Sequence, residues 1–93
     1  MEKLQNYIDG KLIAPKSNEY FDNYEPASGK VYSLIPDSSS EDIVLATAAA
    51  KRAFPIWSKM SIQKRSAIML RIASLIEERT DELAAAESRD NGK

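Results

Sequence analysis

The sequence predicts an α+β fold in which β-hairpins come first and three helices follow. The first 36 residues contain short runs rich in β-branched and aromatic residues, separated by turn sequences. From residue 39 onward, apolar residues recur at helical spacing. We therefore expect a β-hairpin layer over residues 1–36 and helices over residues 39–54, 61–79 and 80–92.

Two hairpins are expected within the first 36 residues. Residues 6–8 and 11–13 flank an Asp-Gly dipeptide at positions 9 and 10, which suits the positive φ angles of a type I′ turn. Residues 20–24 are rich in aromatic side chains, and the turn sequence at 27–30 separates them from an apolar run that Pro36 ends. Two hairpins in series predict a small antiparallel sheet.

The starts of the three helices are predicted from residues that favour helix N-termini. Ser39 with Asp42 three residues later fits a capping arrangement, in which each residue satisfies a backbone N–H of the first turn. Ser61 is the next candidate cap. Thr80, followed by two acidic residues, is typical of a third helix start, because negative charge is favourable at the positive end of the helix dipole.

The helix ends are predicted from Pro and Gly. Pro55 is expected to end the first helix near Ala53, because proline lacks the N–H that continues the hydrogen-bond ladder. Residues 56–60 would then form a short connector. Gly92 fits the left-handed conformation that closes many helices.

The second helix carries an apolar stripe. Ile68, Ile72, Leu75 and Ile76 are spaced so that they lie on one helical face. In an isolated chain of this length we expect that stripe to be exposed, and the chain to self-associate or to be unstable.

Composition limits the possible functions. The chain has 93 residues and lacks both Cys and His, which excludes disulfides, thiolate or imidazole metal sites and Ser-His-Asp or Cys-His nucleophiles. The net charge of −1 gives no reason to expect nucleic acid or an anionic membrane as a partner. No apolar run approaches the roughly 18–20 residues of a membrane span. The N-terminus has no apolar signal segment, so a cytoplasmic location is expected.

Five short segments share their order and content with one enzyme family. They are Asn-Tyr-Ile-Asp-Gly-Lys at 6–11, Glu-Pro-Ala-Ser-Gly-Lys-Val at 25–31, the stretch at 39–43 leading to 48–58, the Arg-to-Glu segment at 65–78, and Ala-Glu-Ser-Arg-Asp-Asn-Gly-Lys at 86–93. Together they resemble the start of NAD(P)-dependent aldehyde dehydrogenases, and the 2-aminomuconic and 2-hydroxymuconic semialdehyde dehydrogenases are the nearest branch. One departure is Glu25, where the family usually has Asn.

The resemblance implies a larger α/β parent enzyme with a Rossmann-like cofactor domain, of which residues 1–93 would be the N-terminal part. In such enzymes a Cys thiolate attacks the aldehyde, the thiohemiacetal passes a hydride to NAD or NADP, and a Glu-activated water releases the acid. In the family, the Cys, the Glu and the cofactor-contacting strands come after the segment that these 93 residues resemble. The resemblance therefore implies that this chain alone has no catalytic residue, no cofactor-binding residue and no bound cofactor. It also implies that the parent is a homo-oligomer, either a dimer or a tetramer.

One site is carried over from the family. Some members bind a structural monovalent cation beside the turn before Pro26 and at the Asp of the last motif. The matching positions are Asn23, Tyr24 and Asp90, which would offer oxygen ligands to Na⁺ or K⁺. The simpler expectation is that Asp90 only forms hydrogen bonds around the helix end at Gly92.

A second interpretation stays open from the residues alone. Amphipathic helices also dock partner proteins, so the chain fits a free-standing α+β protein-interaction module. The scaffold segment of an aldehyde dehydrogenase and the interaction module are therefore the two functional hypotheses.

Overall fold

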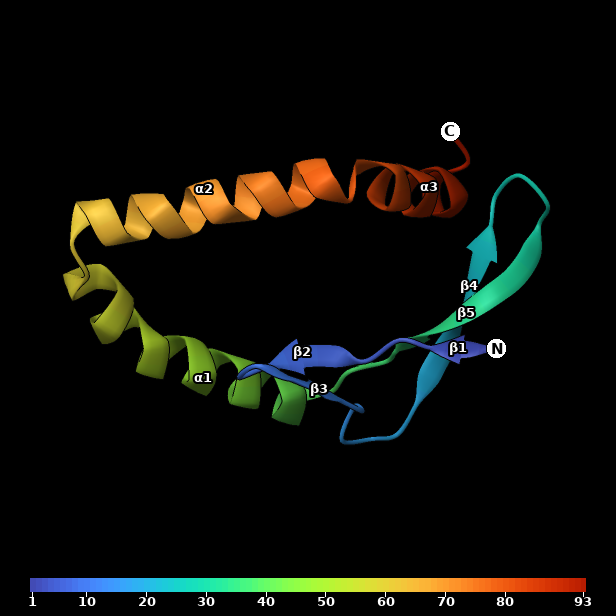
Figure 1. Cartoon of the computed structure of the whole chain (residues 1–93). Coiled ribbons are helices and arrows are strands. Elements are labelled where there is room, and N and C mark those ends of the chain that lie inside the picture. Colours follow the sequence, from blue (N-terminus) through green and yellow to red (C-terminus); the bar gives the residue numbers. More distant parts are fainter.

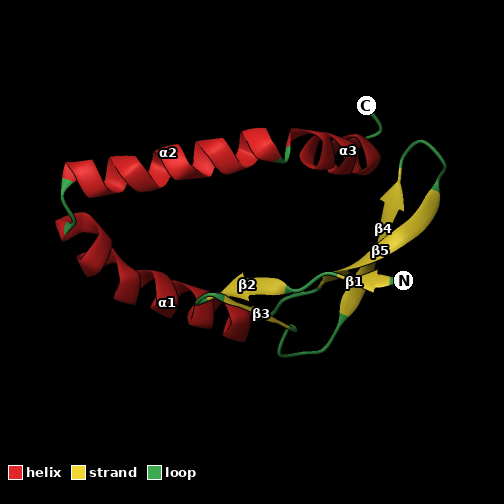
Figure 2. Cartoon of the chain, viewed as in Figure 1, coloured by secondary structure: helices red, strands yellow, loops and turns green.

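The computed structural model describes all 93 residues as a flat arch (Figure 1). Most of the strands lie at one end, the first hairpin lies beside the start of the first helix, and the helices form the rest. Its principal extents are 47 × 34 × 16 Å. The elements in chain order are β1 (Glu2–Lys3), β2 (Asn6–Ile8), β3 (Lys11–Ile13), β4 (Tyr20–Glu25), β5 (Lys30–Pro36), α1 (Ser40–Lys59), α2 (Ile62–Glu78) and α3 (Thr80–Asn91). Strands followed by three helices confirm the predicted α+β class (Figure 2).

The first predicted hairpin is confirmed. β2 and β3 pair antiparallel, with Asn6 opposite Ile13. Asp9 and Gly10 form the turn with φ angles of 53° and 77°, the left-handed values that a type I′ turn requires. Arg52 of α1 lies near this turn, with its Nη2 atom 3.5 Å from Asp9 Oδ2. Both side chains are exposed, so this ion pair contributes little to stability.

The second hairpin is also confirmed, but the expected single antiparallel sheet is wrong. β4 and β5 pair antiparallel, whereas β1 pairs parallel to the other edge of β5, so the sheet is mixed and has the order β1-β5-β4. β2 and β3 form a separate two-stranded sheet. β1 was not predicted because a strand of two residues shows no alternation of apolar and polar side chains. Its partner on β5 lies about 30 residues away in the sequence, so no local pattern indicates the pairing.

α1 begins as predicted but does not end as predicted. The Ser39 backbone N–H donates to Asp42 Oδ2 at 2.9 Å, the reciprocal half of a capping box. The helix then continues through Pro55 to Lys59, so the expected end near Ala53 and the connector at 56–60 are wrong. Proline removes only its own N–H bond, and a slight bend can relieve the clash of its ring with the preceding turn.

α2 and α3 agree closely with the predicted bounds. The Lys64 backbone N–H donates to Ser61 Oγ at 3.2 Å, which confirms Ser61 as the cap of α2. α3 begins at Thr80, directly after Arg79, and ends against Gly92, whose φ of 79° is left-handed. Gly92 N–H donates to Ser88 O at 2.9 Å and closes the helix as expected.

The arch has no hydrophobic core. Ser33 and Asp42 are the buried polar residues, and no large apolar side chain is buried. The radius of gyration is 16.8 Å, whereas a compact domain of this length has about 12 Å. Ile68 and Ile72 of the α2 stripe are 42% and 45% exposed, so the expected exposure is confirmed. None of the helices combines the length and the apolar character needed to cross a membrane.

Candidate functional site

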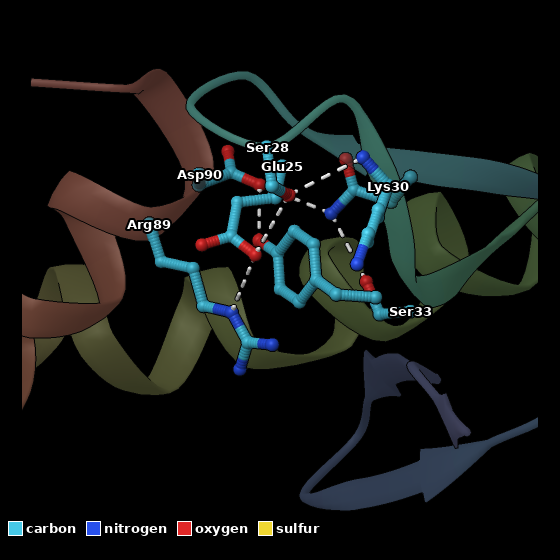
Figure 3. A network of polar contacts seen from close by, with 8 residues as sticks. Glu25, Ser28, Lys30, Ser33, Arg89 and Asp90 are labelled. Atoms are coloured by element: carbon cyan, nitrogen blue, oxygen red, sulfur yellow. Dashed lines mark hydrogen bonds and ion pairs between the residues drawn. The ribbon is translucent and has the colours of Figure 1, made fainter.

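The polar contacts concentrate where the end of α3 meets the β4–β5 hairpin, and Figure 3 shows most of them. This contact, which we call the α3 clasp, joins segments that lie more than 50 residues apart in the sequence and completes the arch. It consists of Asn23, Glu25, Pro26 and Tyr32 from the hairpin together with Arg89, Asp90 and Gly92 from the end of α3.

Asp90 is the centre of the clasp. Its Oδ1 atom accepts a hydrogen bond of 2.7 Å from the Tyr32 hydroxyl and one of 3.0 Å from Asn23 Nδ2. The same Asn23 amide donates to Ser33 Oγ at 3.0 Å, so the buried Ser33 orients it. These hydrogen bonds, with that from Tyr32 the largest contribution, hold the pKa of Asp90 below its usual range. The same hydrogen bond, helped by partial desolvation, raises the pKa of Tyr32.

Arg89 adds a second set of contacts on the neighbouring position of α3. Its guanidinium carbon lies 4.3 Å from the centre of the Tyr32 ring, within range of a cation–π interaction. Its Nε atom lies 3.7 Å from Glu25 Oε2, and that carboxylate also accepts from Ser28 Oγ at 3.4 Å. Glu25, the residue that departs from the family pattern, therefore has a definite partner here.

Gly92 completes the clasp by close approach. A Cβ atom placed on Gly92 would lie 3.0 Å from Pro26 Cβ, and the φ of 79° is one that side-chain-bearing residues rarely adopt. Glycine is thus required at this position both by backbone conformation and by the contact with the hairpin turn.

The proposed cation ligands are only partly brought together. Asn23 and Asp90 are in direct contact and line a cavity of about 440 Å³ beneath the clasp, with Glu2 and Tyr32 on its wall. Tyr24 does not line it, and its side chain is 56% exposed. No group of three or more carboxylate, His or Cys side chains is positioned to hold a metal ion. The simpler expectation for Asp90 is wrong, because its side chain bonds to the hairpin rather than around the helix end.

A second polar cluster lies at the start of α1. Asp42 is 2% exposed, and its Oδ1 atom accepts from the Lys16 backbone N–H at 3.0 Å while Oδ2 accepts from Ser39. These backbone hydrogen bonds, that from Ser39 first, lower the pKa of Asp42 despite its burial. Asp42 therefore ties the loop before β4 to the first turn of α1.

The chain has no glycine-rich loop at a helix N-terminus. Nucleotide phosphates are usually held by a glycine-rich loop at a helix N-terminus. The three glycines here lie apart: Gly10 and Gly29 are in hairpin turns with open space around them, and Gly92 is at a helix C-terminus. There is no Cys to act as a nucleophile.

Comparison with known proteins identifies the family. The aldehyde dehydrogenase family model matches residues 12–93. This chain belongs to the aldehyde dehydrogenase family. It is 46% identical to the mouse (Mus musculus) 2-aminomuconic semialdehyde dehydrogenase over 90 residues, which cover 97% of this chain and 18% of that protein. The chain thus spans about a fifth of the length of the relatives it matches and corresponds to the N-terminal part of their fold.

Two solved structures show the same arrangement of elements. The NAD-dependent aldehyde dehydrogenase from Sinorhizobium meliloti has a TM-score of 0.91 at 36% identity, over all of this chain and 19% of that one. The NAD⁺ complex of the aldehyde dehydrogenase from Bacillus cereus has a TM-score of 0.90 at 33% identity, over 97% and 19% of the two chains. The arch is therefore the shape that this part of an aldehyde dehydrogenase adopts in larger family members.

Two of the five resembling segments meet in space. The segment at 25–31 forms the β4–β5 turn, and the segment at 86–93 forms the end of α3 that closes on it. Sequence reasoning selected Asn23 and Asp90 but missed Tyr32, Ser33 and Arg89. Tyr32 has no partner on β4, because the register shifts between the Asn23–Ser33 and Tyr24–Val31 pairs, so no cross-strand pattern in the sequence pointed to it.

Proposed function

We propose that this chain is the N-terminal scaffold segment of an NAD(P)⁺-dependent aldehyde dehydrogenase, and that it is inactive by itself. In this proposal residues 1–93 are part of the cofactor-binding domain of a cytoplasmic homo-oligomer. The parent oxidises an aldehyde to a carboxylic acid through a Cys thiohemiacetal. The proposal rests on one combined observation: the chain matches the aldehyde dehydrogenase family, but it contains no Cys and no glycine-rich phosphate-binding loop.

The scaffold role follows from which groups are present and which are missing. In this proposal the nicotinamide cofactor supplies the hydride acceptor and is bound by residues beyond this segment; the absence of a glycine-rich loop at a helix N-terminus supports that division. What the chain does supply is a rigid closure, in which α3 is tied to β4 and β5 by Asp90 and Gly92. It also presents exposed apolar faces on α1 and α2, which the remainder of the parent would cover.

A monovalent cation is a further part of the proposal. Na⁺ or K⁺ would be held beside the clasp by oxygens of Asn23, Tyr24 and Asp90, with more ligands from elsewhere in the parent. The contact between Asn23 and Asp90 and the cavity beside them support it. Thermal unfolding in KCl, NaCl and choline chloride at equal ionic strength tests it. A higher Tm in one metal salt, lost in Asp90→Ala, is expected; equal Tm values in all three salts would contradict it.

The scaffold role is best tested by a chimera. Residues 1–93 would replace the matching segment of the mouse 2-aminomuconic semialdehyde dehydrogenase, and NAD⁺ reduction would be measured with that enzyme's aldehyde. We expect a folded, active chimera, an insoluble or inactive enzyme when the segment is deleted, and no activity from the 93-residue chain. Aldehyde-dependent NAD⁺ reduction by the 93-residue chain itself would refute the proposal.

The chimera also separates the scaffold hypothesis from the interaction-module hypothesis. An interaction module has no reason to complement the enzyme, so an inactive chimera together with a stable, folded free chain would favour the module. A matched chimera that carries Gly92→Ala serves as the control. It should lose part of its stability because the clasp, and not the sequence in general, positions α3.

A further inference from the structure

Arg65, in the first turn of α2, carries a buried hydrogen-bond donor without a partner. Its Nε atom is shielded from solvent and forms no hydrogen bond, although the side chain as a whole is only partly buried. The buried carboxylate of Asp42, by contrast, accepts hydrogen bonds from two backbone N–H groups. A buried donor on a charged group costs more when left unpaired than a neutral one does, so the Arg65 guanidinium requires a partner.

α2 itself offers no such partner. Residues three and four positions away on either side share a helix face with Arg65 and could form an ion pair with it. All of these residues are uncharged: Ser61, Ile62, Ile68 and Met69. Arg71 of the same helix differs, because its Nη1 atom lies 3.6 Å from Glu78 Oε1 in an exposed ion pair. The partner of Arg65 must therefore come from another element.

Arg65 lies in the middle of the apolar face of α2. At 100° per residue, six of the seven large apolar residues of this helix fall within an arc of about 140°, and Arg65 lies about 10° from its centre. This apolar face consists of Ile62, Ile68, Met69, Ile72, Leu75 and Ile76. Leu70 lies outside the arc, and so do the two acidic residues of the helix, Glu77 and Glu78.

The apolar face of α2 has no cover within the described chain. α2 forms the upper limb of the arch in Figure 1, and α1 with the β2–β3 hairpin forms the lower limb. Leu75 is partly buried, and the other five residues of the face are at least 42% exposed. This chain spans about a fifth of the length of its relatives, so in the proposed parent most of the polypeptide lies outside it. A later segment of the parent is therefore available to cover the face.

A segment that covers this face also encloses the charge of Arg65. An arginine does not lose its proton in a protein, so it cannot avoid burial of a charge by becoming neutral. Burial of an unpaired charge is strongly unfavourable. A carboxylate meets the need best, because it can accept two parallel hydrogen bonds from one edge of the guanidinium, including one from Nε.

A second copy of the chain does not supply that carboxylate through the same face. In a two-fold symmetric contact the same patch of both copies meets. Glu77 and Glu78 lie outside the apolar face, so an α2–α2 contact would bring Arg65 against apolar side chains. The charge of Arg65 therefore favours a different, acidic segment as the occupant.

We propose that Arg65 forms a buried ion pair with an Asp or Glu on the later segment of the parent that covers the apolar face of α2. The pair fixes the register of α2 against that segment, and the surrounding apolar side chains exclude water from it. This inference rests on the proposed function, because it requires the rest of the parent enzyme.

A charge-removing substitution in the full-length parent provides the first test. Arg65→Met keeps the apolar stem but leaves the carboxylate buried and unpaired, so we expect Tm to fall by at least about 5 °C in differential scanning calorimetry. Arg71→Met is the matched control: it removes an exposed ion pair from the same helix, and Tm should fall by about 1 °C or less. Arg65→Lys keeps the charge without the planar fork and should lie between the two. A Tm of Arg65→Met equal to or above that of Arg71→Met would overturn the proposal.

Rescue of Arg65→Met provides the second test, and it applies also if that variant is insoluble. Random substitutions outside residues 1–93 would be selected for restored soluble protein. We expect rescue when one Asp or Glu is replaced by a neutral residue, because the unpaired charge is then removed. Rescue confined to non-acidic positions, or no rescue, would show that Arg65 has no carboxylate partner.

A disulfide cross-link then shows which chain supplies the partner. Arg65→Cys is combined with Cys at the rescuing position, and the oxidised protein is separated on a denaturing gel without reductant. A cross-link within one chain supports the proposal. A product of twice the chain mass would overturn it in favour of a second copy.

These experiments measure stability and cross-linking without an aldehyde, so they are independent of the test of the proposed function. If Arg65→Met is destabilised as expected in a parent that does not reduce NAD⁺ with an aldehyde, the proposed function fails and the ion pair stands. If the parent is active but Arg65→Met behaves like Arg71→Met, only the ion pair fails.

Discussion

Substitution of Gly92 by alanine tests the clasp most directly. Gly92 has a φ of 79°, and a left-handed conformation costs a side-chain-bearing residue roughly 1–2 kcal/mol. The added Cβ would also lie 3.0 Å from Pro26 Cβ, so the helix end or the hairpin turn must shift. We expect Gly92→Ala to reduce the free energy of unfolding by about 2 kcal/mol or more. Urea unfolding followed by far-UV circular dichroism, at a concentration where the monomer dominates, measures this loss.

Gly29 is a matched control for the backbone part of that loss. Its φ of 70° is similar, but nothing lies within 4 Å of its Cβ position. Gly29→Ala should therefore show the conformational strain without the steric contact. If Gly92→Ala destabilises the chain no more than Gly29→Ala does, the approach of α3 to Pro26 contributes nothing and the clasp is not what closes the arch.

Three further predictions follow from the polar clusters and from α1. Asp90→Asn should return the pKa of Tyr32 toward its usual range, which a spectrophotometric titration of the tyrosines detects; an unchanged titration would mean that their contact does not persist in solution. The folded state lowers the pKa of Asp42 and of Asp90, so both carboxylates stabilise it at pH values above the pKa of an unfolded aspartate, about 4. This stabilisation is lost as the pH falls from there through the lowered pKa values of the folded state. The urea midpoint should thus stay level from neutral pH to about pH 5 and fall below pH 4, with a smaller fall in Asp42→Asn. Pro55→Ala should stabilise α1 by about 1–3 kcal/mol in urea unfolding, since it restores a backbone donor inside the helix; a loss of stability would show that Pro55 is required there.

The fold was predictable where a local signal sufficed. Asp9 and Gly10 required left-handed φ angles, and Ser61 capped the next helix, so the first hairpin and the start of α2 followed from adjacent residues. The end of α1 was not predictable in the same way. The rule that Pro55 ends a helix describes an average cost, and the residues after it keep their own hydrogen bonds in spite of that cost.

The clasp was only half predictable for a different reason. Asn23 and Asp90 are 67 residues apart and were paired by resemblance to a family, while no rule of spacing connects them. Tyr32 and Arg89 were missed because a hydroxyl donor and a stacking guanidinium carry no distinctive local pattern. Contacts that close a chain over such distances depend on the arrangement of whole elements, which periodicity does not encode.

The charge at Asp90 shows why the clasp, and not helix stability, accounts for that residue. A carboxylate in the last turn of a helix lies at the negative end of the helix dipole and is unfavourable there, whereas Arg89 beside it is favourable. The hydrogen bonds from Tyr32 and Asn23 reverse this balance, since they lower the pKa of Asp90 although the helix end alone would raise it. The carboxylate is therefore stabilised by the β4–β5 hairpin and by nothing in its own helix. In a chain without a hydrophobic core, such directional polar contacts are what hold α3 in one position.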